Sequence, residues 1–250
     1  MSGHSHWAKI KRYKSATDAK RGRAWSKLAR RIIVAAKHGG GNPDDNLSLR
    51  YAIDDARAEN MPNDTIKNAI KKGTGELGAV NYENITYEGY GPGGVAYLVE
   101  CLTDNRSRTA PEMRKIFERA GGQMGPVNCV AWMFDKKGVF AITSDKADED
   151  TLMEIALEAG ADDVTRDGDL FEITCSPAAF NKVKEALAAR KIETVSAQIA
   201  MQPRNTVPVG PDKAAQVLGL VEALEEHEDV QNVYANFDIP EEVLAKVGEK

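Results

Sequence analysis

The residues with the clearest chemistry lie at the start of the chain, in "GHSHWAKIKRYK", residues 3–14. Lysine and arginine bind phosphate oxygens, and the ring faces of Trp7 and Tyr13 can stack on unpaired bases. The stretch contains no acidic residue. It is therefore a candidate contact for a polyanion, and a nucleic acid would engage both the cations and the rings.

Charge is distributed unevenly along the chain. The whole sequence has 33 Lys and Arg against 38 Asp and Glu, a net charge of -5. Residues 1–38 contain eleven of the cations and one acid, Asp18, which puts this segment at +10 and the remainder at -15. A solvated charged face is the plainer alternative, but such density of one sign favours a basic arm on an acidic body. The predicted nucleic-acid contacts are Trp7, Lys9, Lys11, Arg12, Tyr13, Lys14, Lys20, Arg21, Arg23, Lys27, Arg30 and Arg31.

A second candidate edge lies in "ECLTDNRSRT", residues 100–109. A strand ending here and a helix beginning here would gather Asp104, Asn105, Arg106 and Arg108, and the arginines could bind a phosphate or a carboxylate. The alternative is that Asp104 and Asn105 form a turn while the arginines pair locally. The sequence leaves both open.

No catalytic arrangement is recognisable. No serine lies in a GxSxG elbow, and no cysteine has an obvious histidine partner. "GYGPGG" (89–94) lacks the lysine of a phosphate-binding loop and lies between two strands, which predicts a hairpin-like turn. His4 and His6 have no third metal ligand at suitable spacing. We therefore expect no enzymatic activity, no cofactor and no metal; the lesser alternative, an enzyme or metal protein, requires distant residues to converge.

Cysteine usage and hydropathy indicate a cytoplasmic protein. Cys101, Cys129 and Cys175 lie in apolar, strand-like runs without a CxxC pair, which indicates reduced thiols. No run approaches the roughly 18 apolar residues of a membrane helix, so we expect no membrane partner. The start lacks the apolar core of a secretory signal. It shares the composition of a mitochondrial transit peptide, but the helices that follow look continuous with it.

The basic residues need helices to position them. Residues 17–37 predict a helix, capped by Thr17, whose apolar stripe lies opposite its cations. Asn42 and Pro43 predict the start of a second helix reaching about Glu59. Asn63 or Asp64 would cap a third helix that closes at Gly73. The expected stripe of the first helix is Trp25, Leu28, Ala29, Ile32 and Ala36.

The rest of the chain contains both strands and helices. "NITYEGY" and "GVAYLVECLT" predict a strand pair, followed by a helix with Thr109 and Glu112 as its capping box. "CVAWMF" (129–134) predicts a further strand. Residues 138–202 then show the order βαββαβ, which is the ferredoxin-like pattern. A last helix, 212–227, and the strand "QNVYANF" cannot stand alone and are expected to join the earlier pieces.

The predicted fold is therefore α+β with three domains, of which two are ferredoxin-like and one is inserted into the other. A single continuous α/β sheet is disfavoured because helices and strands do not alternate regularly. The expected divisions are a flexible basic arm (1–16), a three-helix domain (17–79), a discontinuous middle domain (80–134 plus 204–250) and the inserted domain (135–203).

Several stretches together resemble the YebC family, also called YebC/PmpR, whose relatives include the mitochondrial translational activator of cytochrome c oxidase. The family usually has Lys at the position of His6 and Asn at that of Lys9, and the match is loose after about residue 205. The matching stretches are "GHSHWAKIKRYK", "DAKRGRAWSKL", "AAKHGGGNPDDNLSLR", "YEGYGPGGVAYLVECLTDNRSRT" and "DEDTLMEIALEAGADDV".

The resemblance implies a three-domain cytoplasmic protein with a nucleic-acid-linked role in gene expression and no established catalysis. The family label is probable transcriptional regulator, and some members are described as DNA-binding. Others look like translation factors that act on the ribosome, including at proline-rich stretches. A basic arm with aromatic residues suits unpaired RNA, whereas a cationic helix suits a duplex groove. The expected partners are thus DNA or ribosomal RNA, with the ribosome as a further candidate.

Overall fold

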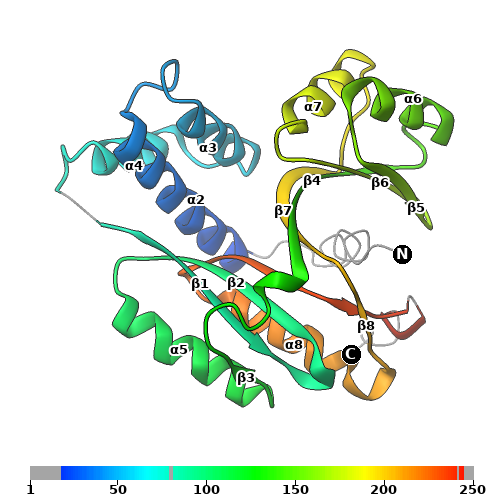
Figure 1. Cartoon of the computed structure of the whole chain (residues 1–250). Helices are drawn as coiled ribbons and strands as arrows, with labels where there is room; N and C mark the ends of the chain where they lie inside the picture. The colour runs from blue at the N-terminus through cyan, green and yellow to red at the C-terminus, as the bar shows by residue number, and fades with distance from the viewer. Residues whose placement is uncertain (1–17, 79–80, 241, 245–250) are drawn as a thin grey trace.

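The computed structural model describes residues 18–78, 81–240 and 242–244, arranged as three bodies (Figure 1). A helical body comes first, a middle body contains a four-stranded sheet, and a third body contains a second four-stranded sheet. The predicted α+β fold is confirmed. The arm of residues 1–16 lies outside the described residues. Within the described part of the chain, no helix has the length and apolar character to cross a membrane.

The helical body is built on the predicted apolar stripe. Leu28, Ile32 and Ala36 are buried in one cluster with residues of the other two helices. Trp25 packs at the border of this cluster, and its indole N–H donates to the carbonyl of Glu59 at 3.0 Å. The stripe thus fixes how the first helix lies on its neighbours. The helices are α2 (Asp18–Gly39), α3 (Leu47–Ala58) and α4 (Asn63–Gly73).

Two helix starts differ from the prediction. The second helix does not begin at Asn42, whose side chain instead accepts from the N–H of Asp44 in a turn. Asn46 is the N-cap: it accepts from Leu49 N–H at 3.1 Å and donates to the Ala35 carbonyl at 2.8 Å. The tertiary contact with α2 therefore selects the later asparagine. The third helix begins at Asn63 after Pro62, without a side-chain cap.

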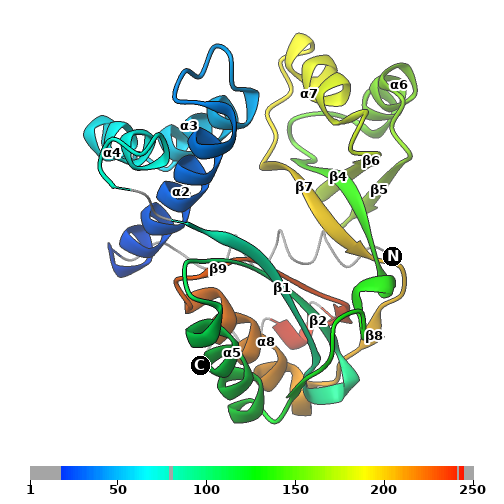
Figure 2. The same ribbon diagram turned by 60° about the vertical axis from the view of Figure 1, so that its left-hand side comes forward.

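The middle body joins segments from both halves of the chain. Its sheet has the order β3-β1-β2-β9, and β2 pairs antiparallel with both β1 and β9. Because β1 and β2 follow one another directly as a hairpin, this body is α+β but does not have the ferredoxin-like order that was predicted for it. Both α5 and α8 cover one face, while the other two bodies stand on the opposite side (Figures 1 and 2). Tyr97, Met113, Phe117 and Leu220 are among the residues of the core between sheet and helices. Its main elements are β1 (Glu83–Tyr90), β2 (Ala96–Thr103), α5 (Arg106–Arg119), β3 (Gln123–Met124), α8 (Pro211–Glu226) and β9 (Val230–Ala235).

Two further predictions in this body are wrong. Helix α5 is capped by Asn105, so Thr109 lies inside the helix, buried, and does not form a capping box. "CVAWMF" is not a strand, because it forms a loop and the 3-10 turn η2 (Ala131–Met133). The buried carboxylate of Glu88 accepts backbone N–H groups from Asn128, Val130 and Ala131, which fixes this segment as a turn.

The third body shows the predicted order βαββαβ. Its antiparallel sheet has the strand order β5-β6-β4-β7, as in ferredoxin-like folds. Phe140, Ile142, Leu152 and Ile155 are buried in the core between the sheet and its helices. The elements are β4 (Phe134–Thr143), α6 (Glu149–Ala159), β5 (Asp163–Asp167), β6 (Leu170–Cys175), α7 (Phe180–Ala189) and β7 (Ser196–Pro203).

The third body is attached through the two paired strands β4 and β7. Phe134 is the register partner of Pro203, so the chain enters and leaves at one place. The guanidinium of Arg204 binds both carboxylate oxygens of Asp135, with Nη2 2.7 Å from Oδ1. Beyond this junction, the strands β8 (Val207–Pro208) and β10 (Phe237–Asp238) pair in parallel. The insertion is therefore anchored at its root.

Candidate nucleic-acid interface

Three of the predicted contact side chains are described, and all three make contacts within the molecule. Arg30 Nη1 donates to the carboxylate of Asp229 at 2.7 Å, and Lys27 Nζ donates to the carbonyl of Glu225 at 2.6 Å. Arg31 forms an ion pair with Asp55 at 2.9 Å. The basic side of α2 was expected to face solvent. In the middle turns of the helix, its cations Lys27 and Arg30 instead contact the corner between α8 and β9. The side chains of Trp7, Lys9, Lys11, Arg12, Tyr13, Lys14, Lys20, Arg21 and Arg23 lie outside what the structure describes.

The four residues of the second predicted edge, Asp104, Asn105, Arg106 and Arg108, do not all behave alike in the structure. Asn105 accepts from the N–H of Arg108, and Arg108 Nη2 contacts Asp104 at 3.1 Å and Asp229 at 2.9 Å. Turn formation and local pairing therefore account for these residues. Arg106 differs, since it is exposed and forms no ion pair with any residue of the described ranges. Of the two arginines, Arg106 is therefore the one that could bind a ligand without first breaking an ion pair to a described residue.

Asp229 is the charged centre of this region. Its side chain is fully buried, with Arg30 on Oδ1 and both Arg108 and the hydroxyl of Thr109 on Oδ2. Burial on its own would raise the pKa of Asp229. The hydrogen bonds from Arg108 and Thr109, with the charge of Arg30, outweigh burial and hold the pKa below its usual range. The sequence signal was weak, because Asp229 stands in an acidic run that looks solvated.

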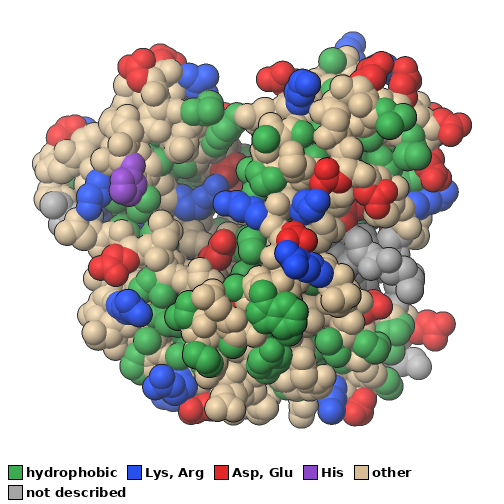
Figure 3. Space-filling model, viewed as in Figure 1, with side chains coloured by type: hydrophobic (Ala, Val, Ile, Leu, Met, Phe, Trp, Pro, Cys, Tyr) green, Lys and Arg blue, Asp and Glu red, His purple; other side chains and the backbone are tan. Residues whose placement is uncertain are grey.

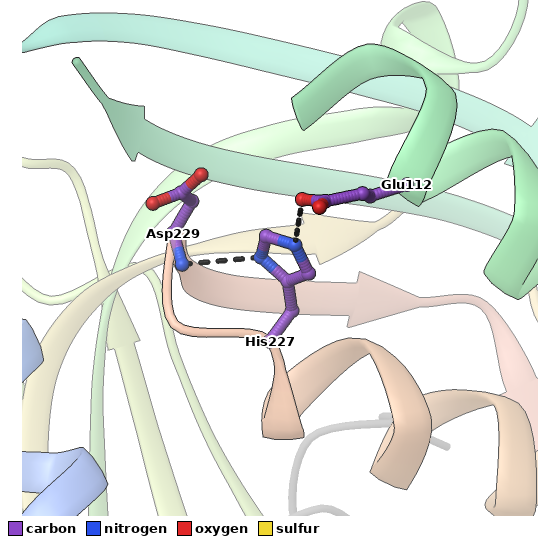
Figure 4. A group of neighbouring side chains, drawn as sticks. All are labelled: Glu112, His227 and Asp229. Carbon is purple, nitrogen blue, oxygen red and sulfur yellow. Dashed lines mark hydrogen bonds and ion pairs between the residues drawn. The ribbon is translucent and has the colours of Figure 1, made fainter. Parts of the chain in front are cut away.

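Asp229 also lies close to Glu112 and His227, and the ligand atoms of these three side chains are within 4.8 Å of one another (Figure 4). This spacing raises the question of whether they could bind a metal ion. His227 Nδ1 accepts the backbone N–H of Asp229 at 3.1 Å, so its proton lies on Nε2, which donates to Glu112 at 2.9 Å. Both oxygens of Asp229 are already bound by guanidinium groups. Two positive charges and occupied ligand atoms oppose a cation, so these residues do not fit a metal site.

A cleft lies over the helix-free face of the middle sheet, beside the root of the third body. It consists of hollows of about 490 and 170 Å³ that share Glu100 and Met201 as lining residues. Figure 3 shows the molecular surface hollowed between the two upper bodies. Glu100 accepts from Asn232 at 2.8 Å, while Arg106 and Lys136 are the cations of the lining. Histidine, cysteine and serine do not occur among the described lining residues.

Sequence reasoning overlooked one group of cations. Lys67, Lys71 and Lys72 on α4 are exposed, and no ion pair joins them to a described residue. Lys67 and Lys71 are four positions apart, which places them on one face of the helix. This spacing was the available signal. Their accessibility contrasts with the engaged cations of α2.

The three-body arrangement, with a cation-rich N-terminal region on an acidic remainder, defines an α+β protein with a discontinuous middle body. A family model described as "TACO1/YebC protein N-terminal domain" matches residues 5–76, and one described as "TACO1/YebC second and third domain" matches residues 82–237. The chain belongs to the TACO1/YebC family.

Curated relatives match this protein over nearly the whole chain. A protein of Desulfatibacillum aliphaticivorans is 54% identical over 98% of this chain and 100% of its own length. A protein of Dictyoglomus turgidum is 53% identical over 98% of each chain. Both are named "Probable transcriptional regulatory protein". A solved structure, a conserved hypothetical protein from Aquifex aeolicus, has a TM-score of 0.82 and 45% identity and covers 92% of this chain and 96% of its own.

Proposed function

We propose that this protein is a non-enzymatic, cytoplasmic regulator of gene expression that binds nucleic acid through its N-terminal cations. The observation that carries the proposal is the charge separation, with +10 in residues 1–38 and -15 in the remainder. Phosphate contacts supply affinity without sequence information, which suits such a cation-rich segment. The remainder is acidic as a whole and would repel a long polyanion over most of its surface, so its main role is to position this segment.

The contacts of α2 support this division of roles. Lys27 and Arg30 hold α2 against the middle body, so these two cations are engaged in the fold. Lys67, Lys71 and Lys72 on α4 add exposed positive charge to the same body. The proposed phosphate contacts are therefore the residues before Lys27, together with these three lysines.

The first target proposed is DNA, in keeping with the name of the relatives. The alternative is a translation factor that binds ribosomal RNA on the ribosome and assists elongation at proline-rich stretches. One observation favours the alternative: the middle cations of α2 are engaged internally, so this helix is poorly placed to enter a duplex groove. An arm with Trp7 and Tyr13 suits unpaired bases instead.

Deleting residues 1–16 tests the proposal. The deletion removes Lys9, Lys11, Arg12 and Lys14, so the slope of log affinity against log salt should shrink by about 3 on single strands and about 3–4 on duplex. Affinities for duplex DNA and single-stranded RNA are measured side by side, which separates the two targets. Trp7→Ala is the matched control: it should weaken single-strand binding by about 1–3 kcal/mol with little change in slope.

If the deleted protein binds both nucleic acids as tightly as the full chain, with the same salt slope, the arm is not the binding element and the proposal fails. Sedimentation of lysate with and without RNase then addresses the ribosome directly. Loss of the protein from the ribosomal fraction after RNase supports the RNA target, whereas indifference to RNase opposes it.

A further inference from the structure

A pair of exposed aromatic side chains lies near the turn that joins β1 and β2. The side chain of Trp132, in η2, is 61% exposed, and that of Tyr90, at the end of β1, is 38% exposed. Val127 in the adjoining loop is 75% exposed. Figure 3 shows hydrophobic side chains gathered on the middle body below the segment that leads into β4. Large exposed apolar side chains in a group mark an interaction site more often than scattered ones do.

Both aromatic side chains are held by one backbone carbonyl. Trp132 Nε1–H donates to the carbonyl of Cys129 at 3.2 Å, and the hydroxyl of Tyr90 donates to the same oxygen at 3.3 Å. Their polar atoms are thus engaged within the protein. What they present outward is ring surface rather than a free hydrogen-bond donor.

The loop that carries Cys129 is itself fixed. Glu88 accepts backbone N–H groups of Asn128, Val130 and Ala131 at 2.7, 2.8 and 2.8 Å. Gly125 N–H donates to the Glu88 carbonyl at 2.8 Å. A rigid loop presents its side chains in the bound arrangement beforehand, which lowers the entropy cost of binding.

Both signs of charge occur near the loop that carries the pair. Asp135 is neutralised by the bidentate contact of Arg204, whose side chain is 56% exposed. Lys136 follows in β4 and is exposed. Arg106, without an ion pair to the described residues, lines the cleft that Val127 also borders. Glu83, Glu88 and Glu100 line the same cleft, so its carboxylates outnumber its cations, and what the pair offers a strand is ring stacking rather than charge.

We propose that Trp132 and Tyr90 form a stacking surface for unpaired bases of the nucleic acid that the N-terminal arm binds, an inference that rests on the proposed function. Every base has a π-face, so stacking on aromatic side chains tolerates any sequence. The arm supplies phosphate contacts, and this surface distinguishes single strands from duplex, whose bases are already stacked. An unpaired RNA or DNA strand is the occupant; a protein partner is the competing outcome of the test.

The test uses the full chain and a 20-nucleotide single-stranded RNA of mixed sequence, with the duplex of the same sequence as reference. Trp132→Ala should weaken binding to the single strand by about 5- to 140-fold, the equivalent of stacking one base, without changing the salt slope. Trp132→Phe should restore most of the affinity. Duplex binding should be unaffected. Leu157→Ala, which removes an apolar side chain that is 80% exposed on α6, is the matched control and should change neither.

A second measurement reports contact directly. In a Trp7→Phe, Trp25→Phe double variant, Trp132 is the sole tryptophan, and the single strand should quench its fluorescence. Unchanged single-strand affinity of Trp132→Ala, or absence of quenching, overturns the stacking surface while the arm deletion still tests the proposed function. Equal weakening on single strand and duplex also overturns it and points to a protein-type contact or a structural role. If the intact chain binds neither nucleic acid, both proposals fall.

Discussion

Arg30 of α2 and Asp229 of the α8–β9 corner, 199 positions apart, meet with Nη1 2.7 Å from Oδ1. The carboxylate is fully buried, and the guanidinium side chain is only 12% exposed. This contact joins the helical body to the middle body. Because Arg108 binds the second oxygen of Asp229 at 2.9 Å, the buried charge is shared between two bodies.

Arg30→Ala should lower the free energy of unfolding by about 1.5–3 kcal/mol, since it removes a charged hydrogen bond from a buried carboxylate while Arg108 still covers Oδ2. Urea unfolding measures the change. Arg31→Ala on the same helix is the control: its pair with Asp55 is about half exposed on both sides and should contribute no more than about 1 kcal/mol. Equal effects of the two variants would contradict the special role of Arg30.

Asp229 should make stability depend on acid pH. Its pKa is lowered on folding, so its contribution is fully present above the unfolded value of 3.8 and is lost as the pH falls through the lower folded pKa. The free energy of unfolding of the native chain should therefore decline below about pH 4. Asp229→Asn should be less stable at neutral pH and show a shallower decline on acidification. Parallel curves for the two proteins would argue against this assignment.

Trp25 should act as a structural residue rather than a base-stacking one. Because it is only partly buried, Trp25→Ala should cost less than the roughly 3–5 kcal/mol of a fully buried tryptophan. Trp25→Phe keeps one six-membered aromatic ring but removes the five-membered ring of the indole, including the N–H that donates to Glu59. Thermal unfolding should rank native above Phe above Ala. An unchanged melting temperature combined with weaker nucleic-acid binding would reverse the assignment.

The inserted segment 135–203 should be removable with a short linker, leaving the remainder folded. Phe134 and Pro203 are register partners, so a linker has a short distance to span. The deletion removes Val139 and Ala200 from the apolar cluster over Leu98, which should lower stability without abolishing cooperative unfolding. Circular dichroism during urea unfolding checks both the shortened chain and the isolated segment. An insoluble remainder, or a segment without a cooperative transition, would count against independent folding.

Local patterns determined most of the fold. The apolar stripe of α2 arises from its spacing of three and four residues, and the order βαββαβ follows from alternating periodicities in residues 138–202. The discontinuous middle sheet was predictable because its late helix and strand had no other partner to bury them. The stripe and the βαββαβ order depend on residues that are neighbours in the sequence, whereas the discontinuous sheet was inferred from elements left without a partner.

Choices between equivalent local signals were decided only by the tertiary structure. Asn42 and Asn46 are both adequate caps, and the carbonyl of Ala35 selects Asn46. "CVAWMF" has strand composition, yet the carboxylate of Glu88 holds its start as a loop by accepting three N–H groups. Both outcomes depend on groups that the sequence places far away.

The candidate site shows the same limit of sequence-based prediction, because the contacts of its basic residues depend on the tertiary structure. The sequence by itself determined that the cations concentrate before residue 38, because net charge is a sum over composition. It could not determine which of them stay available. Only the tertiary structure brings Asp229 to Arg30, and a buried carboxylate must be paired, so that arginine is committed to the fold while the exposed lysines of α4 are not.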